Sequence, residues 1–144
     1  MRWFDDTPYN ETFLSELDKD SFSLTYDMCS KNHFTDNITV RKFINQEIDH
    51  PISIILYEVI APKKIHIYSF EVHKNYRLQD YGRHLMAKFK EVYDEIELSS
   101  LPETKLFYEK MGFVEQEENQ MIWRKGIWLM SAIEQLIKYI LIMY

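Results

Sequence analysis

The first segment with the residue types for chemistry runs from Val72 to Leu85 and reads VHKNYRLQDYGRHL. A run of β-branched and aromatic residues ends at Val72 and a helical pattern begins close to Gly82, so the chain here turns from a strand into a helix. The free N–H groups and the dipole at the start of a helix bind phosphate groups, and Arg77 and Arg83 add charged donors. The segment predicts a phosphate site, although a lone glycine at such a turn also occurs without a ligand.

A second segment runs from Thr104 to Phe113 and reads TKLFYEKMGF. Its helical stretch carries Tyr108 about one turn before Gly112, and a glycine just past a helix end is the usual left-handed cap. An aromatic residue, Phe113, opens the strand that is expected next. Taken alone, this segment predicts core packing rather than catalysis.

Alternating strands and helices must position both segments. The runs Ile52–Ile60 and Ile65–Val72 are β-branched and aromatic, and the break between them predicts a turn joining two strands. A helical face follows, formed by Leu85, Phe89, Val92, Tyr93 and Ile96. The later elements are a strand at residues 96–99, a helix at about 103–111, and strands at 113–116 and 121–124. This order predicts an α/β fold.

Residues 1–50 are polar and contain helix starts. Asn10 precedes the stretch ETFLSELDK, and Asp36 and Asn37 precede a second stretch with spaced apolar residues. The apolar residues of that second stretch are Val40, Phe43, Ile44 and Ile48. We expect one or two short helices in this part of the chain.

The tail from Ile127 to Tyr144 is strongly apolar. One helical stripe of it is polar, with Ser131, Glu134, Gln135 and Lys138. Because a membrane-spanning helix needs about 20 mostly uncharged residues, the internal charges argue against a span. We expect one domain at residues 1–126 and an apolar helix at 127–144, packed on that domain or on a second subunit of a homodimer. Association with a membrane surface is the alternative.

Composition narrows the class of protein. The 144 residues are 46% hydrophobic and 15% aromatic, typical of one globular domain. The chain has only 3 glycines, against the roughly ten that average usage gives, so each should mark a place where no other residue serves. The net charge of -6 argues against nucleic acid and favours a cationic partner. A single cysteine, Cys29, and a start without an apolar signal segment favour a cytoplasmic protein with no disulfide or CxxC zinc site.

Together, and in this order, the two segments resemble the GNAT superfamily of acyl-CoA-dependent N-acetyltransferases. The family's loop pattern, Q/R-x-x-G-x-G/A, is matched by RLQDYG from Arg77 to Gly82, and YGRHLM is similar to the histone acetyltransferase branch. The family's F-Y-x-x-x-G-F pattern is matched by Phe107, Tyr108, Gly112 and Phe113. The resemblance covers residues 52–125. It implies a mixed, mostly antiparallel sheet, flanked by helices, that splays open beside the strand ending at Val72.

The resemblance also implies how acetyl-CoA is bound. The pantetheine arm would bind the backbone of the strand at Phe70 and Val72, and the pyrophosphate would lie on the loop. The loop residues concerned are Arg77, Leu78, Gln79, Asp80, Tyr81, Gly82 and Arg83. The family's reaction is direct attack of an amine on the thioester, so no metal is implied.

Catalytic roles follow from the same resemblance. Tyr108 stands at the family's usual tyrosine, which protonates the departing CoA thiolate, and an ordinary phenol pKa of about 10 suits that role. His66 falls at the position of the glutamate base in the histone acetyltransferase branch, and an imidazole suits removal of an ammonium proton through water. Glu71, on the opposite face of the same strand, and Glu58, on the preceding strand, are alternatives. A histidine or glutamate at such a position is also commonly just solvated.

We therefore expect an N-acetyltransferase that moves an acetyl group from acetyl-CoA to a primary amine of a small molecule or protein. The alternative is a non-catalytic interaction protein that keeps the fold but binds CoA weakly. Two departures from the family pattern favour it: Asp80 replaces the first loop glycine, and Leu101 replaces a CoA-contacting asparagine. The sequence does not identify the acceptor.

Overall fold

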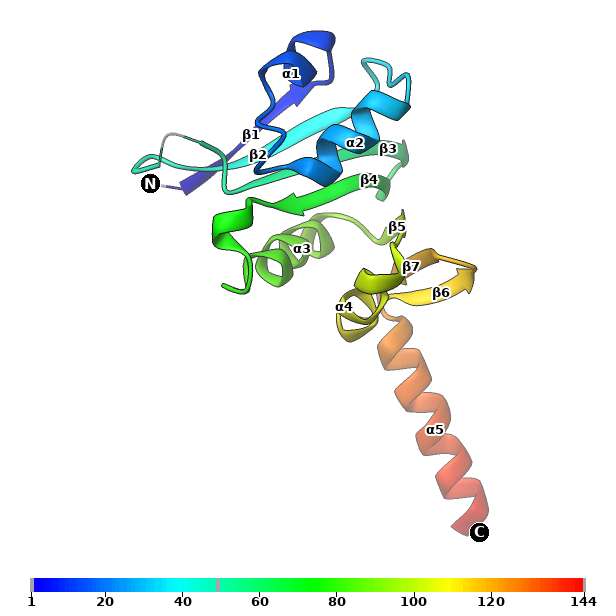
Figure 1. The fold of residues 1–144 in the computed structure, drawn as a ribbon. Coiled ribbons are helices and arrows are strands. Elements are labelled where there is room, and N and C mark those ends of the chain that lie inside the picture. Colours follow the sequence, from blue (N-terminus) through cyan, green and yellow to red (C-terminus); the bar gives the residue numbers. More distant parts are fainter. Residues whose placement is uncertain (1, 49, 144) are drawn as a thin grey trace.

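The computed structural model describes residues 2–48 and 50–143, and within them seven strands form one sheet (Figure 1). The strands are β1 (Arg2–Pro8), β2 (Thr39–Asn45), β3 (Ser53–Ala61), β4 (Lys64–Val72), β5 (Glu95–Ser99), β6 (Val114–Glu117) and β7 (Gln120–Arg124). Their order is β1-β2-β3-β4-β5-β7-β6, and every neighbouring pair is antiparallel except β4 and β5. The expected mixed, mostly antiparallel sheet is confirmed.

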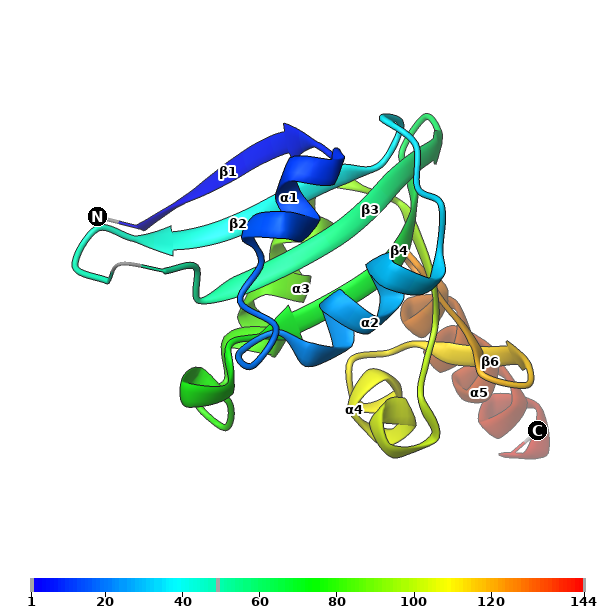
Figure 2. The same cartoon turned by 45° about the horizontal axis from the view of Figure 1, so that its top comes forward.

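Helices cover both faces of the sheet: α1 and α2 lie on one face and α3 on the other (Figure 2). The helical elements are α1 (Glu11–Glu16), α2 (Ser23–Lys31), η1 (Lys74–Tyr76), α3 (Tyr81–Val92), η2 (Pro102–Thr104), α4 (Lys105–Lys110) and α5 (Ile127–Met143). The helix predicted after Asn10 is confirmed as α1, whose first turn is capped by the Asn10 side chain accepting the Phe13 N–H at 3.0 Å. Gly112 has a φ of 90° directly after α4, as the predicted left-handed cap requires.

The helix predicted after Asp36 is wrong, because this stretch forms β2. Both faces of β2 are covered: Val40 packs in the core beneath α1 and α2, while the Arg41 guanidinium lies over the rings of Tyr57 and Phe89 on the α3 side. A strand covered on both faces loses the alternation that identifies strands in a sequence. For the same part of the chain, the sequence reasoning missed β1 and α2.

The helical face predicted from Leu85 onward holds only in part. Leu85 and Phe89 are buried, but α3 ends at Val92, which is exposed. Ile96 is buried in β5 instead, so its spacing from the helix was coincidental.

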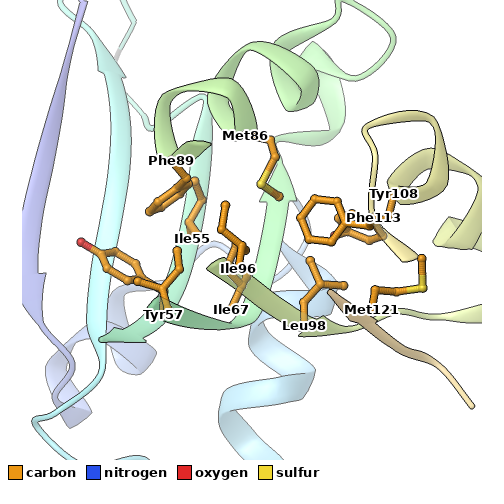
Figure 3. Close-up of a cluster of buried hydrophobic side chains, with 11 residues drawn as sticks. Ile55, Tyr57, Ile67, Met86, Phe89, Ile96, Leu98, Tyr108, Phe113 and Met121 are labelled. Carbon is orange, nitrogen blue, oxygen red and sulfur yellow. The ribbon is translucent and has the colours of Figure 1, made fainter. Parts of the chain in front are cut away.

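The larger hydrophobic core lies between α3 and the middle of the sheet (Figure 3). Its buried side chains are Ile55, Tyr57, Ile65, Ile67, Met86, Phe89, Ile96, Leu98, Tyr108, Phe113 and Met121. Since Tyr108 and Phe113 belong to this cluster, the second segment of the sequence analysis, residues 104–113, is anchored in the core. A second, smaller core lies on the other face, beneath α1 and α2.

The parallel strands β4 and β5 pair over only a few residues, from Lys64 with Glu95 to Ile67 with Leu98. Beyond Ile67, β4 continues to Val72 and is paired only with β3 among the described residues. The sheet therefore splays at this point, and the backbone of the last part of β4 keeps N–H and C=O groups for another partner.

The last helix, α5, extends away from the rest of the molecule (Figure 1). Its described apolar side chains at Ile133 and throughout Leu136–Met143 are exposed. None of the helices in the described part of the chain is long and apolar enough to span a membrane.

Candidate functional site

A cavity of about 560 Å³ lies beside the splay, at the end of β4 and the start of α3. Nearly all the cofactor residues expected from the resemblance line it: Phe70, Val72, Arg77, Leu78, Asp80, Tyr81, Gly82 and Arg83. Tyr108 and Glu71 line it as well, so the two sequence segments meet at one place. Gln79 and His66 are not among its lining residues.

The loop between β4 and α3 holds two non-glycine residues in the left-handed region. Leu78 has a φ of 68° and Asp80 a φ of 67°, and the Leu78 side chain is fully exposed. This conformation costs a residue like leucine about 1 to 2 kcal/mol, whereas aspartate tolerates it better. Asp80 immediately precedes α3, so its left-handed turn directs the first helical N–H groups of Tyr81 and its successors.

An ion pair occupies the same loop. The Arg83 Nε lies 3.2 Å and 3.1 Å from the two carboxylate oxygens of Asp80, and an Arg83 terminal nitrogen makes a third contact. His84 Nε2 lies 3.7 Å from the same carboxylate. The hydrogen bonds from Arg83 lower the pKa of Asp80, which keeps it ionised at neutral pH. Arg83, which the sequence predicts to donate hydrogen bonds to a phosphate group, is thus already paired with a negative charge.

Gly82 permits a close approach of two aromatic rings. A Cβ built on Gly82 would lie 3.0 Å from Phe107 Cζ and 3.7 Å from Phe70 Cε1. Both rings line the cavity, so the missing side chain brings α4 and β4 together across the helix start. The packing of these rings explains why residue 82 is a glycine, whether or not a phosphate group binds nearby.

Arg77 is held by the protein itself. Its Nη2 donates to Glu71 Oε2 at 2.9 Å and its Nε donates to the Val72 carbonyl at 3.0 Å. The Arg77 side chain lines the wall of the cavity and is about half exposed, with 47% of its surface accessible to solvent.

Glu71 has a buried carboxylate that accepts hydrogen bonds from the first turn of α2. The donors are the Leu24 N–H at 3.2 Å, the Thr25 N–H at 2.7 Å and the Thr25 hydroxyl at 2.8 Å. The N-cap residue of α2, Phe22, makes no capping bond with its side chain. A strand residue therefore caps this helix, and both Glu71 oxygens are in use.

Tyr108 joins the core to the cavity. Its side chain is 8% exposed, and its ring lies 5.6 Å from the Phe113 ring centroid. Burial raises the pKa of the Tyr108 phenol to about 12, so the hydroxyl stays protonated at neutral pH. A neutral phenol at the cavity wall has the protonation state that a proton donor needs.

His66 lies at the apex of the splay rather than in the cavity. It is paired in register with Glu97 of β5, and its Nδ1 lies 2.9 Å from Glu97 Oε1. Its ring contacts the Tyr68 ring, with centroids 4.5 Å apart. Tyr68 donates its hydroxyl to Glu58 at 2.8 Å, so Glu58 is also engaged.

One geometric expectation for the base candidates is wrong. Glu71 does not lie on the opposite face of β4 from His66, because a β-bulge near Tyr68 shifts the register against β3. Tyr68 packs in the core beneath α1 and α2, and Glu71 bonds to α2. His66 and Glu71 thus face the same side, about five residues apart along the strand.

Sequence reasoning missed several of the cavity residues. Leu24 lines it from α2, a helix that was not predicted, and Tyr76 and Thr104 contribute from the short 3-10 turns. Composition and spacing give no signal for these positions, because they reach the cavity only through the tertiary arrangement.

The residues present fit an acetyl-CoA molecule in most respects. Beyond Ile67, the edge of β4 that β5 does not cover offers backbone groups to an extended amide chain, and the start of α3 offers N–H groups to phosphate. The Asp80 carboxylate is the one negative group in the loop that opposes a pyrophosphate.

The comparisons with known proteins agree with this geometry. A family model described as the acetyltransferase (GNAT) domain matches residues 14–131. The chain therefore belongs to the GNAT acetyltransferase family. A comparison with curated proteins found no significant match.

Solved structures share the fold. Tetrahymena GCN5 superposes with a TM-score of 0.64 at 17% identity, covering 85% of this chain and 95% of that one. The Bacillus subtilis N-acetyltransferase YlbP protein, solved with coenzyme A, has a TM-score of 0.57 at 17% identity, with 88% and 98% covered. The PaiA N-acetyltransferase from Thermoplasma acidophilum, also solved with coenzyme A, has a TM-score of 0.55 at 13% identity, with 85% and 99% covered. At these identities the similarity establishes the fold alone.

Proposed function

We propose that this protein is an acetyl-CoA-dependent N-acetyltransferase that acts on a primary amine. The observation that carries the proposal is the cavity at the splay, because residues of both sequence segments meet there beside the edge of β4 that β5 does not cover. Similar folds solved with coenzyme A, such as the YlbP protein, support the choice of ligand.

The chain's own groups divide the binding of acetyl-CoA between them. Backbone groups at Phe70 and Val72 hold the pantetheine arm, and the N–H groups of Leu78 to Arg83 hold the pyrophosphate. Phe107, packed against Gly82, closes the wall beside α4. When bound, acetyl-CoA supplies the acetyl group as a thioester.

Two side chains handle the protons in this proposal. Tyr108 gives its hydroxyl proton to the thiolate sulfur as the carbon–sulfur bond breaks, and burial keeps that proton in place beforehand. His66 takes a proton from the acceptor ammonium through water, so that the neutral nitrogen attacks the thioester carbon. We assign Glu71 to structure, since both its oxygens accept hydrogen bonds. A cytoplasmic location and a cationic acceptor remain proposals from charge and cysteine content.

Calorimetric titration with acetyl-CoA, followed by a thiol-release assay over a panel of primary amines, tests the function. We expect saturable binding and amine-dependent thiol release. Absence of acetyl-CoA binding at millimolar concentration contradicts the proposal.

The Asp80–Arg83 pair is the observation that favours the second candidate, a GNAT-fold interaction protein with weak CoA binding. Replacing Asp80 with Asn removes the charge yet tolerates the left-handed backbone, and replacing it with Gly also relieves the backbone. Because the pair is exposed, we expect acetyl-CoA affinity to rise by about threefold or less.

Titrations of Asp80→Asn and Asp80→Gly measure this effect. Asp94→Asn, which weakens an exposed pair with Lys125 elsewhere on the surface, is the matched control and should leave affinity unchanged. A gain of about 30-fold or more from a Kd weaker than millimolar supports the interaction protein instead.

A further inference from the structure

The contact between His66 and Glu97 lies where the two parallel strands separate. His66 and Glu97 form the third of four register pairs between β4 and β5, one residue before the last pair, Ile67 with Leu98. Further along β4, beyond this pair, Phe70, Glu71 and Val72 line the cavity. The His66 side chain is 20% exposed and the Glu97 side chain 28%, so both are partly shielded from water.

The chemistry of the contact assigns the proton on the ring. The His66 Nδ1 and the Glu97 Oε1 are 2.9 Å apart, within hydrogen-bond distance. An ionised carboxylate only accepts, so Nδ1 must be the donor. In the neutral imidazole, Nε2 then carries a lone pair and no proton.

Glu97 is itself fixed by a neighbouring cation. Lys64 Nζ lies 3.4 Å from Glu97 Oε2 and 2.6 Å from Glu95 Oε2. The lysine therefore holds the oxygen of Glu97 that His66 does not use, which helps to keep the other oxygen turned toward the ring.

The His66 ring is also held from a second side. The Tyr68 ring lies against it at 4.5 Å with an interplanar angle of 60°, and the Tyr68 hydroxyl is tied to Glu58. A ring with one nitrogen bonded and one face packed has few rotamers left. Its second nitrogen is the group that remains for another partner.

We propose that Glu97 is a positioning residue that fixes His66 in the tautomer with a free Nε2, ready to accept the proton of the acceptor amine. This inference rests on the proposed N-acetyltransferase function. The proton passes from the amine nitrogen, through water, to Nε2, and the resulting imidazolium keeps its Nδ1–H bond to the Glu97 carboxylate. The carboxylate stabilises the cation and takes no proton itself.

Three variants distinguish a positioning role of Glu97 from an effect on the stability of the fold alone. Glu97→Ala removes the acceptor, and we expect kcat to fall about 10- to 100-fold while the KM for acetyl-CoA changes by less than about twofold. Glu97→Gln keeps an amide oxygen that can accept the Nδ1–H, so kcat should recover to within about threefold of the wild type. Glu95→Ala is the matched control, because Glu95 shares the strand and the Lys64 contact but does not touch His66.

A second measurement reads the tautomer without any turnover. Nitrogen-15 shifts of histidine-labelled full-length protein, assigned with His66→Gln, report which ring nitrogen carries the proton. We expect the proton on Nδ1 in the wild type and in Glu97→Gln, and a mixture of tautomers in Glu97→Ala.

The outcomes are separable from those of the proposed function. A proton on Nε2 in the wild type overturns the inference even if acetyl-CoA binds and amines are acetylated. Equal losses of kcat in Glu97→Ala and Glu95→Ala, or in Glu97→Ala and Glu97→Gln, also overturn it. Failure to bind acetyl-CoA, with the Nδ1 proton observed, contradicts the function and leaves the geometry standing.

Discussion

At the residue scale, Tyr108 combines a place in the core with the role of proton donor that we propose for it. Its ring belongs to the core with Phe113 and Met121, while the residue also lines the cavity beside the splay (Figure 3). Burial that stabilises the fold also holds the phenol neutral, because the anion is poorly solvated there. Core packing and proton donation were alternatives in the sequence, but the structure makes them compatible.

Replacing Tyr108 with Phe keeps the ring and removes the hydroxyl. We expect kcat to fall about 100-fold or more, as loss of a general acid predicts, while the Kd for acetyl-CoA stays within about twofold. Steady-state kinetics and calorimetry measure the two effects separately. Parallel losses of turnover and affinity would instead give Tyr108 a structural role.

Tyr108→Phe should also change how the free energy of unfolding depends on pH in the alkaline range. The folded-state pKa of Tyr108 is raised to about 12 from 10.0, so the unfolded chain ionises first. The stabilisation by the neutral phenol is complete below pH 10 and is lost as the pH rises toward the folded-state value. Between pH 9 and pH 11 this amounts to about 1 kcal/mol. Urea unfolding should show that Tyr108→Phe loses less stability over this interval than the wild type, by that amount.

At the scale of elements, the loop between β4 and α3 is joined to helix α2 through one buried carboxylate. Glu71 of β4 accepts three hydrogen bonds from the first turn of α2 and one from Arg77. Arg77 in turn bonds to the Val72 carbonyl at the end of β4. The start of α2 and the start of the loop are therefore linked by hydrogen bonds, and Leu24 lines the cavity.

Replacing Glu71 with Gln tests this link. A neutral amide cannot satisfy the same donors, so we expect a loss of about 1 to 3 kcal/mol in the free energy of unfolding. Hydrogen exchange at the Leu24 and Thr25 amides should accelerate together. Arg77→Met, which leaves the Glu71 cap on α2 in place, should weaken acetyl-CoA binding but not change exchange at those two amides.

A control for general destabilisation is available in α1. Asn10→Ala removes the cap on the Phe13 N–H, at a cost of about 1 kcal/mol, and should leave the amides of α2 unaffected. Slow exchange at Thr25 in Glu71→Gln would show that α2 does not depend on the strand residue.

At the scale of the whole molecule, α5 is the helix whose described apolar side chains are not buried within the single chain. Apolar side chains from Leu136 to Met143 are exposed, and the helix extends away from the sheet (Figure 1). The apolar side chains of a helix are normally buried against another part of the protein or against a partner. Since the described side chains do not pack on their own domain, we propose the remaining sequence expectation, a second copy of this chain. A net charge of -6 disfavours the alternative of an anionic membrane surface.

Sedimentation over a range of protein concentrations tests the pairing. We expect the full chain to dimerise, since pairing of two copies would bury the exposed apolar side chains of α5. Leu136→Glu with Ile140→Glu should give a monomer that binds acetyl-CoA with unchanged affinity, because the cavity is lined by other elements. Lys138→Glu, on the polar stripe, is the control and should remain dimeric. A wild-type chain that is monomeric at every concentration contradicts the proposal.

Local signals in the sequence predicted the elements from β3 to β7 and singled out the segments 72–85 and 104–113. The prediction succeeded there because local signals are strong: β-branched runs, a glycine cap at Gly112 and a turn into α3 depend on neighbours in the chain. Nearly all the residues that the family resemblance predicts to bind acetyl-CoA line one cavity in the structure. Before Ile52 the sequence predicted α1 correctly but missed β1 and α2, and it mistook β2 for a helix because β2 is covered on both faces and lacks alternation.

The partners of the charged side chains could be found only from the three-dimensional arrangement of the strands and helices. The bulge near Tyr68 turned Glu71 toward α2, and the β4–β5 register placed Glu97 against His66. These outcomes depend on a one-residue shift in register and on partners 31 and 46 residues away along the chain. Spacing within a segment carries no information about such contacts, because long-range pairing is set by which strands become neighbours and where they separate.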